Sequence, residues 1–148
     1  MKATMTIVLV LFCFSLAAIA SENEAAAKAI FQKAISDCKG IDGGEFDSTQ
    51  KTTTLHDLTG DGRPEEIVDA SHFSCSTAAS RWGGSGGTYL WAIGDGKAYE
   101  FLAHRWKVED MDGQNILLLA VHSSECSDEI GPCYRAVVWG DEGFRTIR

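Results

Sequence analysis

The residues best suited to chemistry lie in one short segment, where oxygen-bearing side chains alternate with other residues around two glycines. The segment reads Asp-Leu-Thr-Gly-Asp-Gly-Arg-Pro-Glu from residue 57 to residue 65. A hard cation such as calcium binds about six to eight oxygen ligands, and a glycine-containing loop can curl to present them. The spacing therefore predicts a calcium site. Its ligands would be the side chains of Asp57, Thr59, Asp61 and Glu65 and the carbonyl oxygen of Arg63.

The spacing excludes an EF-hand, because that loop needs a Glu at its twelfth position and Val68 stands there. The segment instead resembles the calcium loop of FG-GAP or VCBS-type proteins, D-x-[DN]-x-D-G-x-x-D, over residues 57–68. This resemblance implies a calcium ion bound between two strands of an exported β protein. Thr59 and Glu65 depart from the motif, and its single copy gives no reason to expect the family's propeller. The alternative is a plain turn whose aspartates cap their own backbone.

A second metal site is not expected among the histidines, which are His56, His72, His104 and His122. None has a partner at HxH or HxxxH spacing. Asp112-Gly113 predicts a type I′ hairpin turn, and in that hairpin His104 and His122 lie on opposite faces, because successive strand side chains alternate. We therefore expect ordinary strand histidines.

Catalytic motifs are few. Glu65, Glu66 and Asp69 are close in sequence, and a carboxylate pair can carry out acid/base hydrolysis. There is no G-x-S-x-G, no H-E-x-x-H and, once the cysteines are bridged, no cysteine nucleophile. The glycine-rich residues 81–88 lack the G-K-[ST] ending of a phosphate-binding loop. We expect Trp82 within them to pack back on the sheet, the alternative being contact with a ligand. The sequence favours a binding protein, with a small hydrolase or a structural envelope protein as alternatives.

Length and charge indicate one acidic domain. The chain has 148 residues, with 13 Lys and Arg against 21 Asp and Glu, and a net charge of -8. This balance argues against a surface for nucleic-acid phosphates and favours a cationic partner through electrostatic steering. We expect Asp128 and Glu129, in the acidic loop between Cys126 and Cys133, to contact that partner. An inhibitor of a basic envelope hydrolase is one form that such a module can take.

The first twenty residues have the pattern of a signal peptide. Lys2 precedes an apolar run from Ile7 to Leu16, and Ala18-Ile19-Ala20 supplies the small-x-small pattern that precedes cleavage. The run is shorter than the roughly 20 residues of a membrane-spanning helix, although an uncleaved anchor is the alternative. We expect a mature domain of residues 21–148, periplasmic or secreted, with no stable membrane insertion after cleavage.

Four cysteines follow the predicted cleavage point, namely Cys38, Cys75, Cys126 and Cys133. An even number in an exported chain predicts two disulfides, and four cysteines allow three pairings. Gly131-Pro132 is a turn signal between the last two cysteines. We therefore expect Cys126 to bond to Cys133, which leaves Cys38 to bond to Cys75.

One helix and a series of strands must position these groups. Residues 21–39 predict a helix, because Ala26, Ile30, Ala34 and Cys38 recur at helical spacing and Gly40 follows as a stop signal. Residues 41–48 predict a connection. Strands are predicted at residues 52–58, 66–74, 88–93, 98–108, 115–122, 134–139 and 144–147. The expected fold is α+β, with the N-terminal helix packed on an antiparallel sheet or small barrel of six to seven strands.

The Asp112-Gly113 turn also fixes a register. A two-residue type I′ turn between the strands at 98–108 and 115–122 pairs Trp106 with Leu119 and Val108 with Leu117. Both pairs are apolar, so this register is consistent with a buried face.

Overall fold

The computed structural model describes residues 4–126 and 133–147, with side chains from residue 22 onward. Helix α1 (Thr4–Lys39) is followed in the described residues by strands and three 3₁₀ turns, η1 (Gln50–Thr52), η2 (Ala70–His72) and η3 (Ser123–Glu125). The strands are β1 (Phe46–Ser48), β2 (Thr53–His56), β3 (Glu65–Asp69), β4 (Phe73–Cys75), β5 (Gly83–Gly84), β6 (Gly87–Gly94), β7 (Lys97–Ala103), β8 (Arg105–Met111), β9 (Gln114–Val121), β10 (Cys133–Gly140) and β11 (Gly143–Ile147).

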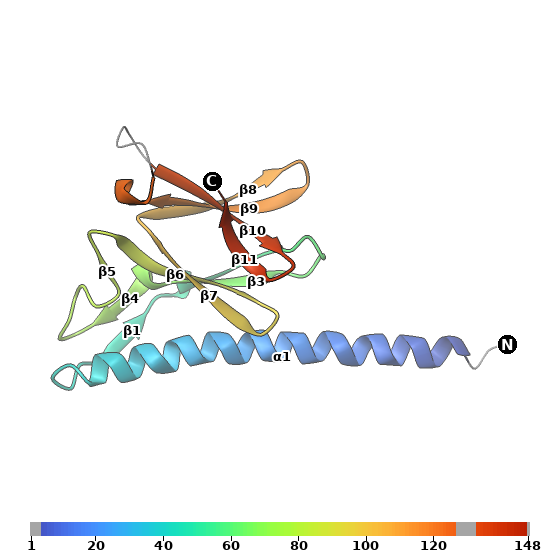
Figure 1. Cartoon of the computed structure of the whole chain (residues 1–148). Helices are drawn as coiled ribbons and strands as arrows, with labels where there is room; N and C mark the ends of the chain where they lie inside the picture. Colours follow the sequence, from blue (N-terminus) through green and yellow to red (C-terminus); the bar gives the residue numbers. More distant parts are fainter. Residues whose placement is uncertain (1–3, 127–132, 148) are drawn as a thin grey trace.

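The strands form three antiparallel sheets. A central five-stranded sheet has the order β2-β3-β6-β5, with β7 on the other edge of β6. A four-stranded sheet has the order β11-β10-β9-β8, and β1 pairs with β4 in a small separate ribbon. Helix α1 lies along one side of the central sheet and the four-stranded sheet lies on the other (Figure 1). The α+β class is therefore confirmed, but the single sheet or small barrel of six to seven strands is wrong.

The main reason for this difference is a corner at His104. The strand predicted over residues 98–108 is two strands, because the chain leaves the central sheet after Ala103 and enters the four-stranded sheet at Arg105. The strand predicted over residues 66–74 is likewise interrupted by η2, where the Asp69 carboxylate caps the turn. An alternating apolar pattern continues through such corners, so it does not show that the chain has changed sheets.

Turn chemistry predicted the β8–β9 hairpin correctly. Trp106 pairs with Leu119 and Val108 with Leu117. Asp112 has φ 58° and Gly113 has φ 85°, the positive values that a type I′ turn requires. The register could be derived from sequence because a two-residue turn leaves only one pairing of the strands that follow it.

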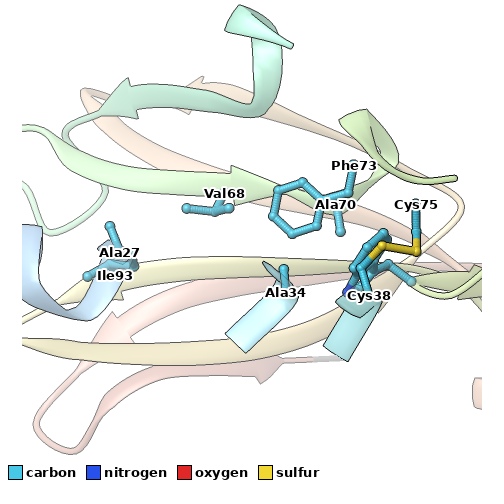
Figure 2. Packing of buried hydrophobic residues seen from close by; sticks show 9 residues of the cluster. Ala27, Ala34, Cys38, Val68, Ala70, Phe73, Cys75 and Ile93 are labelled. Atoms are coloured by element: carbon cyan, nitrogen blue, oxygen red, sulfur yellow. A yellow bond between two sulfur atoms is a disulfide. The ribbon is translucent and has the colours of Figure 1, made fainter. Parts of the chain in front are cut away.

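Two apolar cores hold the layers together. The first lies between α1 and the central sheet and includes Ala34, Val68 and Phe73 (Figure 2). The second lies between the two large sheets and includes Ile67 and Leu117. Ile67 and Val68 are neighbours in β3 with no exposed surface, because alternation sends one side chain to each core.

Trp82 belongs to the first core. It is 7% exposed and packs edge-to-face on Phe46 and Phe73. The expectation that this tryptophan packs back on the sheet is confirmed.

Helix α1 ends at Lys39 as predicted, and the Gly40 N–H still donates to the Ser36 carbonyl at 2.9 Å. It begins at Thr4 rather than at residue 21, and its N-terminal end extends beyond the sheets (Figure 1). From residue 22 onward, where side chains are described, no helix is long and apolar enough to cross a membrane.

Both predicted disulfides are present. Cys38 at the end of α1 is bonded to Cys75 in β4, with the Cα atoms 5.6 Å apart (Figure 2). Cys126 is bonded to Cys133 at the start of β10, with the Cα atoms 6.0 Å apart. Two disulfides fit a protein of an oxidising environment.

Candidate functional site

The predicted calcium loop joins β2 to β3 and is anchored where it leaves β2. Leu58 is only 2% exposed and belongs to the core between the sheets. The Asn115 side chain, from β9, donates to the Asp57 carbonyl oxygen at 2.9 Å. Gly60 and Gly62 have positive φ values of 78° and 83°, which allow the sharp curl that follows these anchors.

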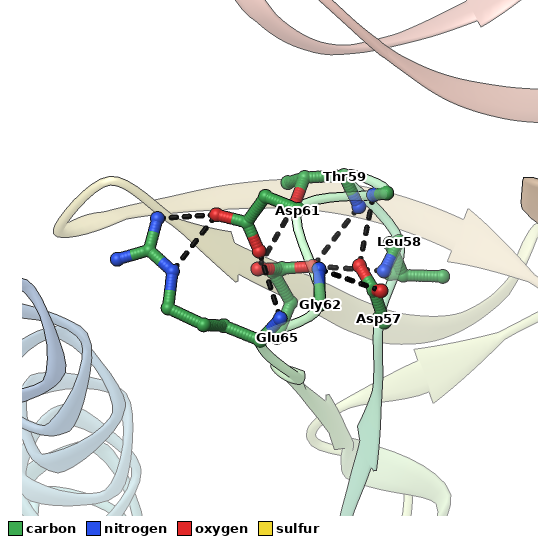
Figure 3. Close-up of polar contacts among 8 residues, drawn as sticks. Asp57, Leu58, Thr59, Asp61, Gly62 and Glu65 are labelled. Carbon is green, nitrogen blue, oxygen red and sulfur yellow. Dashed lines mark hydrogen bonds and ion pairs between the residues drawn. The ribbon is translucent and has the colours of Figure 1, made fainter. Parts of the chain in front are cut away.

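Glu65 closes the loop from inside. Glu65 is 5% exposed, and its carboxylate accepts the N–H groups of Leu58 at 2.8 Å and Thr59 at 3.0 Å (Figure 3). Burial raises the pKa of the Glu65 carboxyl, the two backbone donors lower it, and the nearby charges of Asp61 and Asp57 raise it further. Glu65 is therefore a buried acceptor with two negative neighbours.

The two aspartates also bind donors of the loop itself. Asp57 accepts the N–H groups of Gly60 at 2.8 Å and Gly62 at 2.9 Å. Asp61 accepts the backbone N–H and the Nε–H of Arg63, both at 2.8 Å, and forms an ion pair with its guanidinium. The Arg63 side chain lowers the pKa of the Asp61 carboxyl, mainly through hydrogen bonding. A cation at Asp61 would have to compete with Arg63.

These contacts bear on both interpretations of the loop. A carboxylate has about four lone-pair positions, so each of the three carboxylates keeps some acceptor capacity beside its present donors. Within residues 4–126 and 133–147, no three His, Cys, Asp or Glu side chains are grouped closely enough to hold a metal ion. The self-capped turn accounts for the observed hydrogen bonds without an ion, and the calcium site remains a prediction.

The histidine argument needs one correction. The rings of His104 and His122 lie with centroids 6.1 Å apart, not on opposite faces of the hairpin. His104 precedes β8 and His122 follows β9, and strand alternation does not extend to residues outside the ladder. His122 Nδ1 is paired with the Ser124 hydroxyl at 2.8 Å.

The acids that are clustered in the sequence, Glu65, Glu66 and Asp69, are distributed over both faces and along the length of β3. Glu65 and Glu66 point to opposite faces of β3, as adjacent strand residues do. Asp69 is about 13 Å further along the strand from Glu65, at ~3.3 Å per residue. Asp69 accepts the Ser71 N–H at 2.8 Å and the Trp106 indole N–H at 2.7 Å. Burial raises the pKa of Glu66 as well, but neither Glu65 nor Glu66 lines the two grooves described next.

Two grooves flank β7, and no sequence pattern indicated them. One, of about 510 Å³, lies between β7 and the four-stranded sheet; it includes Phe101, Leu119, Val121, His122 and Arg135. The other, of about 220 Å³, lies between α1 and the central sheet; it includes Ile30, Asp37, Arg81, Tyr89 and Trp91. Glu100, in the middle of β7, lines both grooves.

The groove on the helix side combines aromatic faces with a carboxylate. Tyr89 and Trp91 lie on the same face of β6, with ring centroids 5.9 Å apart and nearly parallel planes. The Trp91 indole N–H donates to Glu100 at 3.1 Å across the β6–β7 pair. Among the described side chains, this indole is the donor to Glu100. Asp37, in contrast, is paired with Lys33 at 2.8 Å and Arg81 at 3.0 Å.

The groove on the sheet side combines apolar and polar groups, with Arg135 as its cation. Arg135 lies on the inner face of β10, and its guanidinium is 3.2 Å from the Glu125 carboxylate. Leu119 and Val121 form the adjoining surface on β9. Asp128 and Glu129, the predicted partner contacts, lie outside the described residues.

Comparison with models of known protein families, with curated proteins and with solved structures gives no match.

Proposed function

We propose that this chain is an exported, non-enzymatic binding module, periplasmic or secreted, that recognises a cationic partner. The observation that supports this function best is Glu100, an exposed carboxylate where the two grooves meet, beside the rings of Tyr89 and Trp91. Aromatic faces next to a carboxylate suit a lysine or arginine side chain, because both the rings and the carboxylate attract a cation. The net charge of -8 steers such a partner toward the protein. Inhibition of a basic hydrolase would be one consequence of this binding.

Binding to basic proteins should depend on Glu100 and on salt. In a pull-down from an envelope extract, we expect the mature protein to retain basic proteins at low salt and to release them at high salt, where charges are screened. Glu100→Gln should reduce this capture by severalfold, because Gln keeps an acceptor for the Trp91 indole but removes the charge. Mass spectrometry of the eluates identifies the retained proteins.

The matched control is Glu142→Gln, which makes the same charge change at an exposed position outside both grooves. Equal effects of the two variants would show that only net charge matters. Retention of mainly acidic proteins would contradict the proposed function.

We also propose that the loop at residues 57–65 binds calcium weakly. The grouping of three carboxylates supports this proposal. Burial is the main cause of the raised pKa of Glu65, the charges of Asp61 and Asp57 raise it further, and a cation would relieve that repulsion. The ligands would be Asp57, Thr59, Asp61, the Arg63 carbonyl and Glu65, with affinity in the weak range of extracellular calcium modules.

Calcium should therefore raise the melting temperature. Binding to the folded state alone adds roughly 1.4 kcal/mol at ten times Kd, or about 3–6 °C for a domain of this size. Magnesium should do less, because it requires tighter octahedral geometry and retains its waters. Asp61→Asn should remove the rise in melting temperature with calcium. Asp112→Asn changes an aspartate of the β8–β9 turn, which is not a proposed ligand, and should keep it. If the wild type melts at the same temperature in millimolar calcium and in chelator, the loop is only a self-capped turn and does not bind calcium.

A further inference from the structure

Strand β7 has one edge without a strand partner in the described part of the chain. It pairs with β6 along Lys97 to Ala103, and β6 in turn pairs with β3 and β5 on its far edge. An edge strand presents a row of backbone N–H and C=O groups to which another strand can bond. Proteins commonly protect such edges with charged side chains, proline or a bulge. Strand β7 (Lys-Ala-Tyr-Glu-Phe-Leu-Ala) has neither proline nor a bulge in its paired register, and its two charges are Lys97 at its start and Glu100 at its centre.

The β6–β7 turn shows which amides of β7 point outward. Asp95 and Gly96 have φ values of 48° and 70°, so they form a two-residue type I′ turn in which Gly94 and Lys97 are the first hydrogen-bonded pair. Hydrogen-bonded and non-hydrogen-bonded pairs then alternate along an antiparallel ladder. Lys97, Tyr99, Phe101 and Ala103 therefore bond to β6. The outward N–H and C=O groups belong to Ala98, Glu100 and Leu102, which are all exposed.

Space for a further strand lies beside this edge. The groove of about 510 Å³ is bounded by Glu100, Phe101 and Leu102 of β7 on one side and by β9, β10 and β11 on the other. The groove of about 220 Å³ lies on the opposite face of the same strand. A strand added to β7 would direct alternate side chains toward these two grooves, because side chains alternate along a strand.

The chemistry of the two grooves specifies the pattern of that strand. Side chains on the helix side would lie near Glu100 and the rings of Tyr89 and Trp91, which favour a basic residue. The two cations of this groove, Lys33 and Arg81, are paired with Asp37. Side chains on the other side would meet Phe101, Leu119 and Val121, which favour an apolar residue. Arg135 in that groove already has Glu125 as its counter-charge.

We propose that β7 binds an extended segment of a basic partner as an added β-strand, with basic and apolar residues in alternation. This proposal rests on the proposed function and specifies how the partner is held: backbone hydrogen bonds give affinity, and the two grooves select alternate side chains. A second copy of the chain fits less well. Glu100 is the central residue of β7, so symmetric antiparallel pairing of two β7 strands would place two Glu100 carboxylates opposite each other.

The test uses a fluorescent peptide of alternating lysine and valine, matched in length to β7, with alternating glutamate and valine as its control. Fluorescence anisotropy should show binding of the lysine peptide and none of the glutamate peptide. Amide hydrogen exchange should show new protection of Ala98, Glu100 and Leu102 in the complex. Failure of the lysine peptide to bind at millimolar concentration would overturn strand addition.

Two substitutions at one position separate backbone pairing from side-chain contact. Leu102→Pro removes an outward N–H without removing a bond to β6, a position where edge strands tolerate proline. Leu102→Ala keeps that N–H. We expect Leu102→Pro to weaken peptide binding about tenfold or more, the effect of roughly one lost backbone hydrogen bond, and Leu102→Ala to weaken it by less than about threefold. Exchange in the wild type gives the same answer should the proline variant fold poorly.

The outcomes distinguish this mechanism from the wider function. Equal binding by both Leu102 variants, with no protection of the three amides, would overturn strand addition while basic proteins are still captured through Glu100. Protection that increases with protein concentration in the absence of peptide would identify a second copy as the occupant, and would also overturn it. If the wild-type protein captures no basic proteins at all, this result would instead contradict the proposed function.

Discussion

Replacing Cys38 and Cys75 together with alanine should lower the free energy of unfolding by about 4 kcal/mol, because the unfolded chain regains the entropy of a long loop. The bond closes a separation of 37 residues and ties the end of α1 to β4. Cys38 has no exposed surface and Cys75 is 5% exposed, so the lost sulfur contacts add to the effect. Thermal unfolding followed by near-ultraviolet circular dichroism should show a fall of roughly 10–15 °C.

The second disulfide provides the comparison for this experiment. Cys126 and Cys133 are only 7 residues apart, and the same entropy model gives about 2.5 kcal/mol for their replacement by alanine. The long bridge should therefore matter more than the short one. A larger loss for the short bridge would show that α1 is held on the central sheet mainly by its apolar face and not by the covalent tie.

Replacing Glu65 with alanine should lower the free energy of unfolding by about 2–3 kcal/mol, because the buried N–H groups of Leu58 and Thr59 lose their acceptor. Glu65→Gln should cost less than about 1 kcal/mol, since the amide oxygen can accept the same donors and the repulsion from Asp57 and Asp61 disappears. Chemical denaturation of both variants at neutral pH, in chelator, measures the difference. Equal losses would show that the charge, and not the acceptor, holds the loop.

Glu65 also predicts how stability depends on pH. Burial raises the pKa of this carboxyl in the folded protein above its ordinary value, so the folded state retains the proton to higher pH than the unfolded chain. The stabilisation from this group is then fully present below the unfolded pKa and is lost as pH rises through the folded pKa. The unfolding free energy of the wild type minus that of Glu65→Gln should therefore decrease from about pH 4 upward. A difference that grows with pH would contradict a raised pKa of Glu65 in the folded protein.

The subtraction is needed because other groups act in the opposite direction. Hydrogen bonding to Lys33 lowers the pKa of Asp37, and hydrogen bonding to Arg63 lowers that of Asp61. These groups contribute stability that is lost as pH falls through their folded pKa values. Asp37 and Asp61 are present in both the wild type and Glu65→Gln, so their contributions largely cancel and the difference reports mainly on Glu65.

Local chemistry accounts for what could be derived from the sequence. Helix α1 ends at Lys39 because its apolar pattern stops at Cys38 and Gly40 is a helix stop signal. Asp112-Gly113 determined the β8–β9 register because its conformation admits one pairing. The turn signal between Cys126 and Cys133 predicted their bond, and Cys38 and Cys75 were then the remaining pair. In each case the deciding interaction acts over a few residues.

The sequence by itself thus determined the α+β class, the helix end, most strands, the two disulfides and the loop at residues 57–65. Only the tertiary structure decided the three layers, the corner at His104, the inward position of Glu65 and the place of Glu100 between two grooves. The physical reason is that a strand's alternation tells which side chains share a face, but not which sheet the strand joins or which edge stays without a partner. Those depend on contacts between segments far apart in the chain, such as β7 with the surface of β9 and β10.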